Sequence, residues 1–296
     1  MFFRLISVCS LGLFASASVS CLSVRNYDSL GPTQDSVKMK VMPVDSSTSH
    51  FVCWNVHKAS DETFTKDVGE LLEAVPKDNN LILCLQEVRS TTFDMIKGLH
   101  REEVSGHYAP SWRLPFTKLS TGVLTIANRP LPDSGVIPIR APRRELLVAS
   151  PKVSLKSEVP LADGRMLQII NCHGLNFVPF SVLPGQLDQI FDTLEASNSP
   201  AIVCGDFNVW SERRLKLLNQ RTTDAGLAEV HPRGLQHSPS PKWLRWMIRI
   251  NGFDPKIRLD RIYTRGLEVL DCYSHTGSES SDHLPLVMSY KVLPKR

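Results

Sequence analysis

One short apolar run in this chain stops abruptly at a glycine and two polar side chains: Ala201-Ile202-Val203-Cys204-Gly205-Asp206-Phe207-Asn208. Its apolar part predicts a buried strand, and Gly205 predicts a turn at the strand end, because glycine has no Cβ to clash. If the backbone stays extended beyond it, Asp206 and Asn208 point the same way and offer a carboxylate and an amide at the mouth of a strand. For this stretch alone, an ordinary strand end followed by an Asx turn is the alternative.

Polar side chains follow predicted strands in four further places. These groups are Asn55, Gln86-Glu87, Asn171-Cys172-His173 and, before the last apolar run, Ser281-Asp282-His283. Burying such side chains costs free energy unless they are paired or hold a metal, so a purely structural protein has little reason to repeat them. The repetition therefore predicts a functional site built from strand ends.

The first twenty residues predict an export signal that is not part of the fold. Arg4 precedes an apolar region from Leu5 to Phe14, and small residues follow as far as Ser20. This apolar region is too short to span a bilayer. Cys21 follows directly in a sequence that resembles a bacterial lipobox, so a lipid attachment to the membrane through Cys21 and ordinary cleavage near Ser20 are both open. Either way we expect the protein to be exported, as a secreted, periplasmic or membrane-anchored protein.

Beyond the leader, the composition predicts a tether and one domain. Residues 21–50 are rich in Ser, Thr, Asp and Pro and predict a flexible tether. Residues 51–296 are long enough for one large α/β domain. The formal net charge of +4 permits an anionic substrate, but it is far from that of a dedicated nucleic-acid-binding domain.

Helical and strand-like patterns alternate along this domain. Apolar residues recur at helical spacing in Asp67–Val75 and again in Gln186–Leu194, each between two predicted strands. Gly122–Ala127 and Leu146–Val153 predict successive antiparallel strands. We therefore expect mixed sheets with helices packed outside them.

The cysteines predict packing rather than chemistry. The chain has seven of them and no Cys-x-x-Cys pair, so neither a zinc site nor a redox pair is indicated. Four lie within apolar strand runs, where a small buried side chain is the expectation: Cys53, Cys84, Cys172 and Cys204.

Seven short motifs together resemble the endonuclease/exonuclease/phosphatase superfamily, in order and in spacing, over residues 51–290. The motifs are Trp54-Asn55, Leu85-Gln86-Glu87, Thr121-Gly122-Val123, Asn171-Cys172-His173, Gly205-Asp206-Phe207-Asn208, Leu259-Asp260-Arg261-Ile262 and Ser281-Asp282-His283. Two stretches, 205–214 and 263–267, are similar to a bacterial branch of that superfamily. The resemblance implies a DNase I-like fold, a four-layer α/β sandwich of two packed mixed sheets flanked by helices. It also implies metal-dependent hydrolysis of a phosphate ester.

Hydrolysis of a phosphate ester needs a hard cation to neutralise developing charge and a group that activates water. Magnesium suits this role, with manganese as an alternative, because it takes oxygen ligands and is held by one or two carboxylates. Glu87 follows a wholly apolar run and is the first candidate metal ligand, with Asp282 as the second.

The candidate catalytic residues are His283, Asp260, Asp206, Asn208, His173 and Asn55. His283 is the acid/base candidate, and the resemblance implies that Asp260 orients it. Asp206 and Asn208 would orient the attacking water and the phosphate oxygens, and Asn55 would hold the phosphate or a ligand. By the same resemblance, His173 faces the phosphate or the leaving group, although a histidine in a strand is more often structural.

Two further residues are candidates for substrate binding, Asn171 and Arg89. Arg89 lies two residues after Glu87, on the same face of a regular strand, where a phosphate contact and an exposed salt bridge are both open. His57, two residues after Asn55, we interpret as structural.

Between the central motif and Asp260, the segment Lys242–Ile250 places Trp243, Trp246 and Met247 on one helical face beside two arginines. Such a face suits a nucleic-acid strand, a membrane interface, or packing on the domain. The sequence therefore predicts an exported phosphodiesterase or endonuclease. The alternatives are a sphingomyelinase-like or inositol-phosphate hydrolase, and a binding module that keeps the fold without catalysis. No protein partner is predicted.

Overall fold

The structure is a computed structural model. It describes residues 33–35, 48–59, 61–75, 80–92, 95–96, 104–113, 119–129, 131–132, 137–143, 151–176, 178–194, 199–234 and 257–295. The export signal, Cys21 and the tryptophan segment Lys242–Ile250 lie outside the described residues. Within the described part, no helix is both long and apolar enough to cross a lipid bilayer.

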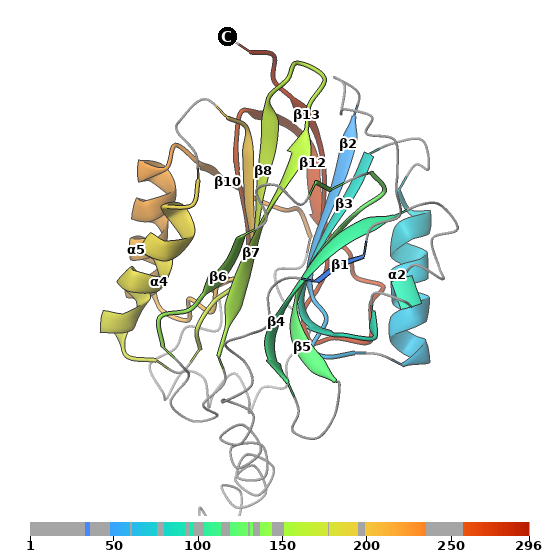
Figure 1. Ribbon diagram of the computed structural model, residues 1–296, viewed down its shortest axis with the longest axis horizontal. Coiled ribbons are helices and arrows are strands. Elements are labelled where there is room, and N and C mark those ends of the chain that lie inside the picture. The colour runs from blue at the N-terminus through green and yellow to red at the C-terminus, as the bar shows by residue number, and fades with distance from the viewer. Residues whose placement is uncertain are drawn as a thin grey trace, which may run out of the picture.

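Two sheets pack face to face, and helices cover both outer faces, as Figure 1 shows. The first sheet has the strand order β1 (Thr33–Asp35), β4 (Ser105–Arg113), β5 (Ser120–Ala127), β3 (Asn80–Arg89), β2 (Ser49–Asn55), β13 (Leu286–Val292) and β12 (Leu267–Ser274). The second has the order β10 (Ala228–Val230), β11 (Asp260–Arg265), β9 (Ala201–Asp206), β8 (Met166–His173), β7 (Val153–Pro160) and β6 (Ile137–Arg140). The predicted four-layer DNase I-like sandwich is confirmed.

Each sheet contains one parallel pair of strands joined through a helix. In the first sheet β2 and β3 are parallel and α2 (Glu62–Glu73) connects them. In the second, β8 and β9 are parallel and are connected through the short 3₁₀ helix η2 (Phe180–Val182) and α4 (Leu183–Phe191). The other strand pairs are antiparallel. Because parallel strands finish at the same edge of a sheet, each pair delivers the polar residues at its two ends to one place.

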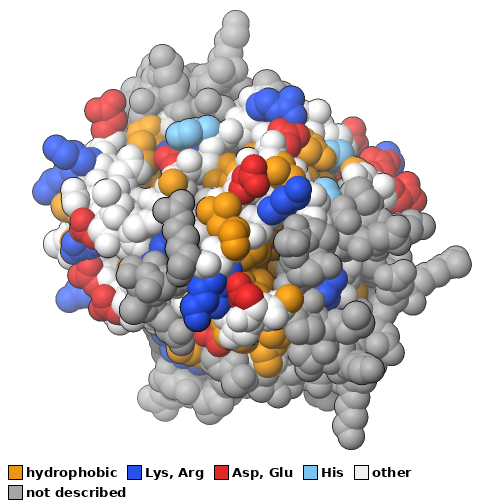
Figure 2. All heavy atoms as spheres, turned by 90° about the horizontal axis from the view of Figure 1, so that it is seen from above, with side chains coloured by type: hydrophobic (Ala, Val, Ile, Leu, Met, Phe, Trp, Pro, Cys, Tyr) orange, Lys and Arg blue, Asp and Glu red, His pale blue; other side chains and the backbone are white. Residues whose placement is uncertain are grey.

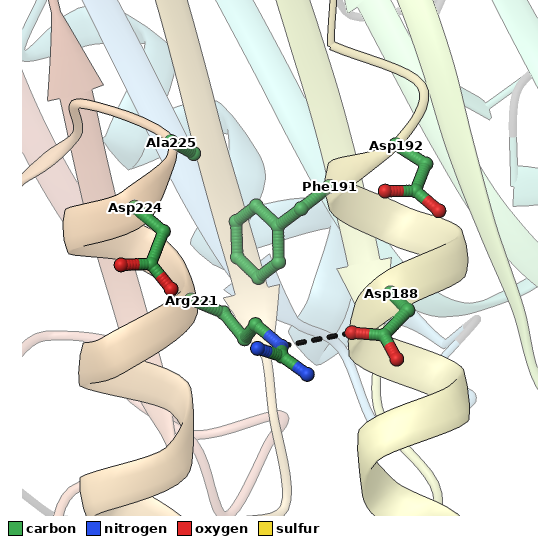
Figure 3. A pocket seen from close by; sticks show the side chains of 6 residues that line it. All are labelled: Asp188, Phe191, Asp192, Arg221, Asp224 and Ala225. Carbon is green, nitrogen blue, oxygen red and sulfur yellow. Dashed lines mark ion pairs between the residues drawn. The ribbon is translucent and has the colours of Figure 1, made fainter.

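The helices pack their apolar faces against the outer faces of the two sheets. In Figure 1, α2 covers the first sheet, while α4 and α5 (Glu212–Asp224) cover the second. Phe191 of α4 lies between α4 and α5, and Nε of Arg221 pairs with Oδ1 of Asp188 at 2.8 Å (Figure 3). The surface pocket at this junction contains none of the predicted site residues. It is lined by Asp188, Phe191, Asp192, Arg221, Asp224 and Ala225.

Three apolar layers hold the sandwich together. Between the sheets, Phe51 and Ile82 pack against Ile169 and Ile202. The outer face of the first sheet packs against Phe64, Val68 and Leu71 of α2, and the outer face of the second against α4 and α5. Cys53, Cys84, Cys172 and Cys204 are free and buried, which confirms their expected role as small packing residues, and Cys272 is also free and buried.

Gly205 is needed for close approach, not for a turn. It lies inside β9 with φ +135°, and a Cβ at this position would come within 1.9 Å of the carbonyl oxygen of Cys172 on β8. The prediction that Gly205 turns the chain at the strand end was therefore wrong: the strand continues to Asp206 because only glycine lets β8 and β9 lie this close.

Several expected boundaries shift. Helix α2 begins at Glu62 rather than Asp67, because the side chain of Asp61 caps it by accepting from the backbone N–H of Phe64. Helix α4 covers 183–191 rather than 186–194. The expected tether 21–50 contributes β1, which pairs with β4, and the first residues of β2. Of the expected strand 146–153, residues 146–150 lie outside the described part, and β7 begins at Val153.

The end of the sandwich at which β13 finishes carries a mixed surface. This end holds the C-terminus in Figure 1, and Figure 2 views it directly, with acidic, basic and apolar side chains interspersed. The polar strand ends described next lie at the opposite end, where β13 begins beside the last residues of β2.

Candidate active site

Three polar pairs link the two sheets in a row at one end of the sandwich. Each pair takes one residue from each sheet. A residue just before β13 faces β11, the end of β2 faces β9, and the end of β3 faces β8. The pairs are His283–Asp260, Asn55–Asp206 and Glu87–His173, and in the last of these Nζ of Lys152 contacts both side chains. The pairing follows from strand order, because β13-β2-β3 lies opposite β11-β9-β8. Residues from six distant stretches of sequence thereby form one site.

The first pair joins an imidazole to a carboxylate. Nδ1 of His283 lies 2.6 Å from Oδ2 of Asp260. Burial alone would lower the pKa of His283, but the charges of Asp260 and Asp206, and the hydrogen bond with Asp260, raise it to about 10. The ring is therefore protonated at neutral pH, with Nδ1–H bonded to Asp260 and Nε2–H available as a donor.

The backbone around His283 is also fixed. Its N–H donates to Oγ of Ser281 at 3.1 Å, and its carbonyl oxygen accepts from Nε1 of Trp54 at 3.0 Å. Oγ of Ser281 in turn donates to the carbonyl oxygen of Asn55 at 2.7 Å. The loop that carries His283 is thus tied directly to the end of β2.

The second pair surrounds a buried carboxylate with amide donors. Oδ2 of Asp206 accepts from Nδ2 of Asn55 at 3.0 Å and from Nδ2 of Asn208 at 3.3 Å, while Oδ1 accepts from the backbone N–H of Asn208 at 3.0 Å. The last contact closes an Asx turn, and Asn208 has φ 52°. The expectation of an extended backbone through Asn208 was therefore wrong, although the turn still brings its amide onto Asp206.

Asp206 has an acid–base property that suits proton transfer near neutral pH. Its side chain is buried, and burial raises its pKa to about 6 against the opposing charge of His283. Asp260 lies directly opposite it in the pairing of β9 with β11, and its negative charge acts in the same direction as burial.

The third pair is centred on Glu87, at a β-bulge. The register of β3 against β5 shifts between Leu85 and Val88, and Glu87 has φ 55°, an uncommon conformation for a residue with a Cβ. Oε2 of Glu87 pairs with Nζ of Lys58, and Oε1 lies 3.7 Å from Nζ of Lys152. Burial alone would raise the pKa of Glu87, but the charges of Lys152 and Lys58 hold it well below its usual range.

His173 turns toward Glu87 and a lysine. Its Nε2 lies 3.6 Å from Oε1 of Glu87 and 2.9 Å from Nζ of Lys152. Burial, together with the charge of Lys152, holds the pKa of His173 well below its usual range. The ring is neutral, so its Nε2 accepts from Lys152 and its proton resides on Nδ1. His173 therefore belongs to the site as a neighbour of Glu87.

Asn171 holds the sheets together and does not bind substrate. Its side chain is fully buried; Nδ2 donates to the carbonyl oxygens of Leu85 and Leu124, and Oδ1 accepts from Nε2 of Gln86 at 2.7 Å. The prediction of substrate binding by Asn171 was wrong, because these contacts use both of its N–H groups inside the sandwich.

Arg89 is half-buried at the end of β3, opposite Thr121 of β5. Its expected place beside Glu87 rested on regular alternation along the strand. The bulge at Glu87 breaks that alternation.

Asp282 also differs from its expected role. Its side chain is exposed, with Oδ1 3.0 Å from Nδ1 of His57 and 3.9 Å from Nε2 of His283. The hydrogen bond with Asp282 raises the pKa of His57, and the interpretation of His57 as structural stays a prediction. Asp282 and Glu87 lie at the same end of the molecule, but Asp282 pairs with His57 and Glu87 with Lys58.

A match to a family of known proteins agrees with this geometry. The model of the endonuclease/exonuclease/phosphatase family matches residues 52–283, which contain all the pairs above. The chain belongs to the endonuclease/exonuclease/phosphatase family. A UPF0294 protein of Yersinia pseudotuberculosis is 32% identical over 242 residues, covering 81% of this chain and 82% of the relative. The predicted similarity to a bacterial branch of the family is thereby confirmed.

Solved structures of other family members share the fold. An endonuclease/exonuclease/phosphatase from Beutenbergia cavernae superposes with a TM-score of 0.63 at 14% identity, covering 84% of this chain and 72% of that one. TDP2 from D. rerio, crystallised with a single-strand DNA product, has a TM-score of 0.56 at 14% identity and covers 83% of this chain and 100% of that one. These likenesses show the fold, and the matched family is one of phosphoester hydrolases, the endonucleases, exonucleases and phosphatases.

The family implies a divalent metal ion, and Glu87 fits one. Magnesium is commonly held by one or two carboxylates with water completing its shell, and Glu87 supplies a buried anionic oxygen at the row of pairs. Among the described residues, no group of three His, Cys, Asp or Glu side chains is arranged to hold a metal ion. Glu87 would therefore hold the ion, and Nζ of Lys58, which pairs with Oε2 of Glu87, would compete with it.

Two residues of the site were missed in the sequence. Lys58 follows β2 in a turn where His57 and Lys58 both have positive φ, and Lys152 immediately precedes β7. A lone lysine in a polar stretch normally predicts a solvated surface. The buried setting of Lys152 would have been indicated only by Val153 directly after it, at the start of a buried strand.

Proposed function

We propose that this protein is an exported, magnesium-dependent phosphodiesterase, with nucleic acid as its substrate class. The observation that carries the proposal is the row of three cross-sheet pairs, above all the 2.6 Å contact of His283 with Asp260 beside a buried Asp206. The row combines a charged proton donor, a carboxylate of raised pKa and an anionic oxygen for a metal ion.

The pKa values divide the roles between His283 and Asp206. A group that activates water works best with a pKa near the working pH, which suits Asp206 at about 6. His283 is already protonated and cannot accept that proton; its Nε2–H stabilises negative charge on a phosphoryl oxygen or protonates the leaving group. Of the two roles open to His283 as the acid/base candidate, this assignment keeps the acid and gives the base to Asp206.

The remaining side chains orient these groups. Asp260 holds the His283 ring by Nδ1, and the amides of Asn55 and Asn208 hold the Asp206 carboxylate in place. Glu87 would hold a magnesium or manganese ion, which when bound neutralises charge on the phosphate. Lys152, next to Glu87, adds a positive charge where an anionic substrate arrives.

Nucleic acid is favoured over a lipid headgroup by one comparison and one property of the chain. The similar TDP2 structure holds a single-strand DNA product, and the formal net charge of this chain is +4. A mildly basic protein of this fold suits a transiently bound phosphodiester strand.

The deciding experiment is an activity panel on the purified protein. Single- and double-stranded DNA, RNA, sphingomyelin and inositol phosphates are each incubated with magnesium, with manganese and with EDTA, using His283→Ala as the blank. We expect metal-dependent cleavage of a nucleic acid that the blank lacks. Cleavage of sphingomyelin or an inositol phosphate alone would contradict nucleic acid as the substrate class and put the cleaved compound in its place. No cleavage in any arm, with metal bound, would favour a binding module.

We infer that the protein is exported, from the charged, apolar and small-residue order of residues 1–20. Mass spectrometry of the N-terminus in cell fractions tests this, and an intact leader in the cytoplasm would contradict it. Membrane attachment through Cys21 is tested separately: Cys21→Ser should abolish incorporation of a labelled fatty acid.

A further inference from the structure

A buried carboxylate on α2 is bonded to the loop that carries His283. Asp67 lies on the buried face of α2 with Phe64, Val68 and Leu71, and its side chain is only 2% exposed. Charged side chains are seldom buried without partners, because removing a carboxylate from water costs free energy. The position of Asp67 therefore calls for a specific set of donors.

Those donors come from two consecutive residues more than two hundred positions away. Oδ2 of Asp67 accepts from the backbone N–H groups of Glu279 and Ser280, both at 2.8 Å, and from Oγ of Ser280 at 2.7 Å. Hydrogen bonds to an ionised acceptor are about twice as strong as those between neutral groups. One carboxylate oxygen thus fixes two backbone positions of the loop.

The loop has few other constraints before it reaches the site. It leaves β12 after Ser274 and is closed at its base where the N–H of His275 donates to the carbonyl oxygen of Pro285 at 2.8 Å. Residue Ser281, next to the positions held by Asp67, binds both Asn55 and His283. The order along the chain is therefore an attachment to α2, then an attachment to β2, then His283.

The same helix supports His283 by a second contact. Phe64, one turn before Asp67, stacks on Trp54 with ring centroids 5.8 Å apart, and Nε1 of Trp54 donates to the carbonyl oxygen of His283. Helix α2 therefore contacts the His283 loop directly before Ser281, through Asp67, and supports it after Ser281 through Trp54 of β2.

We propose that Asp67 is a positioning residue for His283: its carboxylate sets the backbone at Glu279 and Ser280, so that Ser281-Asp282-His283 reaches across to Asp260. The proposal rests on the proposed function for His283, but its geometry does not depend on which substrate is cleaved. A displacement of a reacting group by about 1 Å is enough to cost about 100-fold in rate.

The experiment compares three variants in the full chain. Asp67→Asn keeps the shape but removes the charge, and Ser280→Ala removes one of the three hydrogen bonds. Leu218→Ala is the control for a general loss of stability, because Leu218 is buried on α5 against the second sheet and belongs to a different apolar cluster from Phe64 and Trp54. Melting temperature is measured for all three.

Three readouts distinguish positioning from general stability. Backbone hydrogen exchange of residues 279–283 reports the loop, ¹⁵N-histidine NMR of the Nδ1–H of His283 reports its bond to Asp260, and kcat and KM report catalysis. For Asp67→Asn we expect faster loop exchange, a shifted or broadened His283 signal, and a kcat reduced by about 10- to 100-fold with KM nearly unchanged. Ser280→Ala should show a smaller change of the same kind.

Leu218→Ala should lower the melting temperature and leave the other readouts at wild-type values. An unchanged His283 signal in Asp67→Asn would overturn the proposal, as would equal changes in Leu218→Ala. Because exchange and NMR need no substrate, they test the positioning role even if the activity panel fails.

Discussion

Asp206 and Asp260 occupy paired positions on the neighbouring strands β9 and β11, and Asp260 binds Nδ1 of His283 at 2.6 Å. Two carboxylates and one imidazolium therefore share the end of the second sheet. Asp260 is bonded to His283, whereas Asp206 accepts from amide donors and has a raised pKa. This division of partners leads to different expectations for the two acids.

His283 and Asp260 should act as one unit. General acid–base groups typically contribute about 10²- to 10⁴-fold in rate, so His283→Ala should reduce kcat by about that factor. It should also lower the melting temperature at neutral pH, because the raised pKa of His283 reflects a stabilising ion pair with Asp260. Asp260→Asn should lose a similar or smaller factor, and the double variant should be scarcely worse than His283→Ala, because residues acting together are not additive. The exposed His231 offers a control in His231→Ala. Multiplicative losses in the double variant would contradict the coupling.

Asp206→Asn should change how stability depends on pH. The pKa of Asp206 is about 6 in the folded protein, above roughly 3.9 for an unfolded aspartate. Between these values the folded state keeps a proton that the unfolded chain has released, so the contribution of Asp206 to stability is present below pH 4 and is lost as the pH rises through about 6. The Asp206→Asn variant should lose this pH dependence, which amounts to about 3 kcal/mol, since one pKa unit corresponds to about 1.4 kcal/mol.

Urea unfolding of both proteins at several pH values between 4 and 7 measures this difference. Asp224→Asn, on the exposed face of α5, is the control. A wild-type pH slope that survives in Asp206→Asn would assign the raised pKa to another group. In parallel, the wild-type kcat/KM should rise with pH through about 6, and Asp206→Asn should lack that ionisation.

Glu87 and Lys58 should affect metal binding in opposite directions. Glu87→Gln removes the anion and should weaken magnesium binding while the fold remains intact. Lys58→Met removes the ammonium group that pairs with Oε2 of Glu87, and should tighten magnesium or manganese binding by about tenfold, since the side chain of Lys58 is partly in solvent. Isothermal titration calorimetry with the metal alone measures both.

Lys66→Met is the matched control, because Lys66 pairs with Glu70 on the exposed face of α2. Equal metal affinity in wild type and Lys58→Met would show that the ion does not bind against Lys58, and unchanged affinity in Glu87→Gln would remove Glu87 as a ligand.

Asn171→Ala should lower stability rather than metal affinity. The substitution leaves the carbonyl oxygens of Leu85 and Leu124 and the amide of Gln86 without their partner inside the sandwich. An unsatisfied buried polar group costs about 1–3 kcal/mol, so we expect a loss of several kcal/mol in the free energy of unfolding. Gln220→Ala, on the exposed face of α5, is the control. Normal stability with weakened substrate binding would restore Asn171 to the binding site.

The sequence was informative where polar residues ended apolar runs. Asn55, His173 and Asp206 end strands, Glu87 lies near the end of one, and His283 precedes one. The strand ends of this fold meet at one place. The residues that were misplaced are those whose position depends on a local irregularity. Arg89 was placed by regular alternation, which the bulge at Glu87 breaks, and Asn208 by an extended backbone, which its positive φ replaces.

Contacts between distant segments explain the remaining differences. Lys152 and Lys58 are ordinary lysines in the sequence, and only the packing of the two sheets brings both to Glu87. The role of Asn171 has the same origin, because its three partners come from β3 and β5 of the opposite sheet. No local pattern marks an asparagine that faces another sheet.

The row of cross-sheet pairs makes the geometry of the site depend on how the two sheets are positioned relative to each other. Every pair spans the interface, so sliding one sheet along the other by a single residue, about 3.3 Å, would separate all three pairs together. Each sheet would keep its own ladder of hydrogen bonds during such a slip. When the interface between the sheets loosens, we therefore expect catalysis to be lost before secondary structure. An activity assay during mild denaturation would report the packing of the two sheets against each other rather than the folding of either sheet.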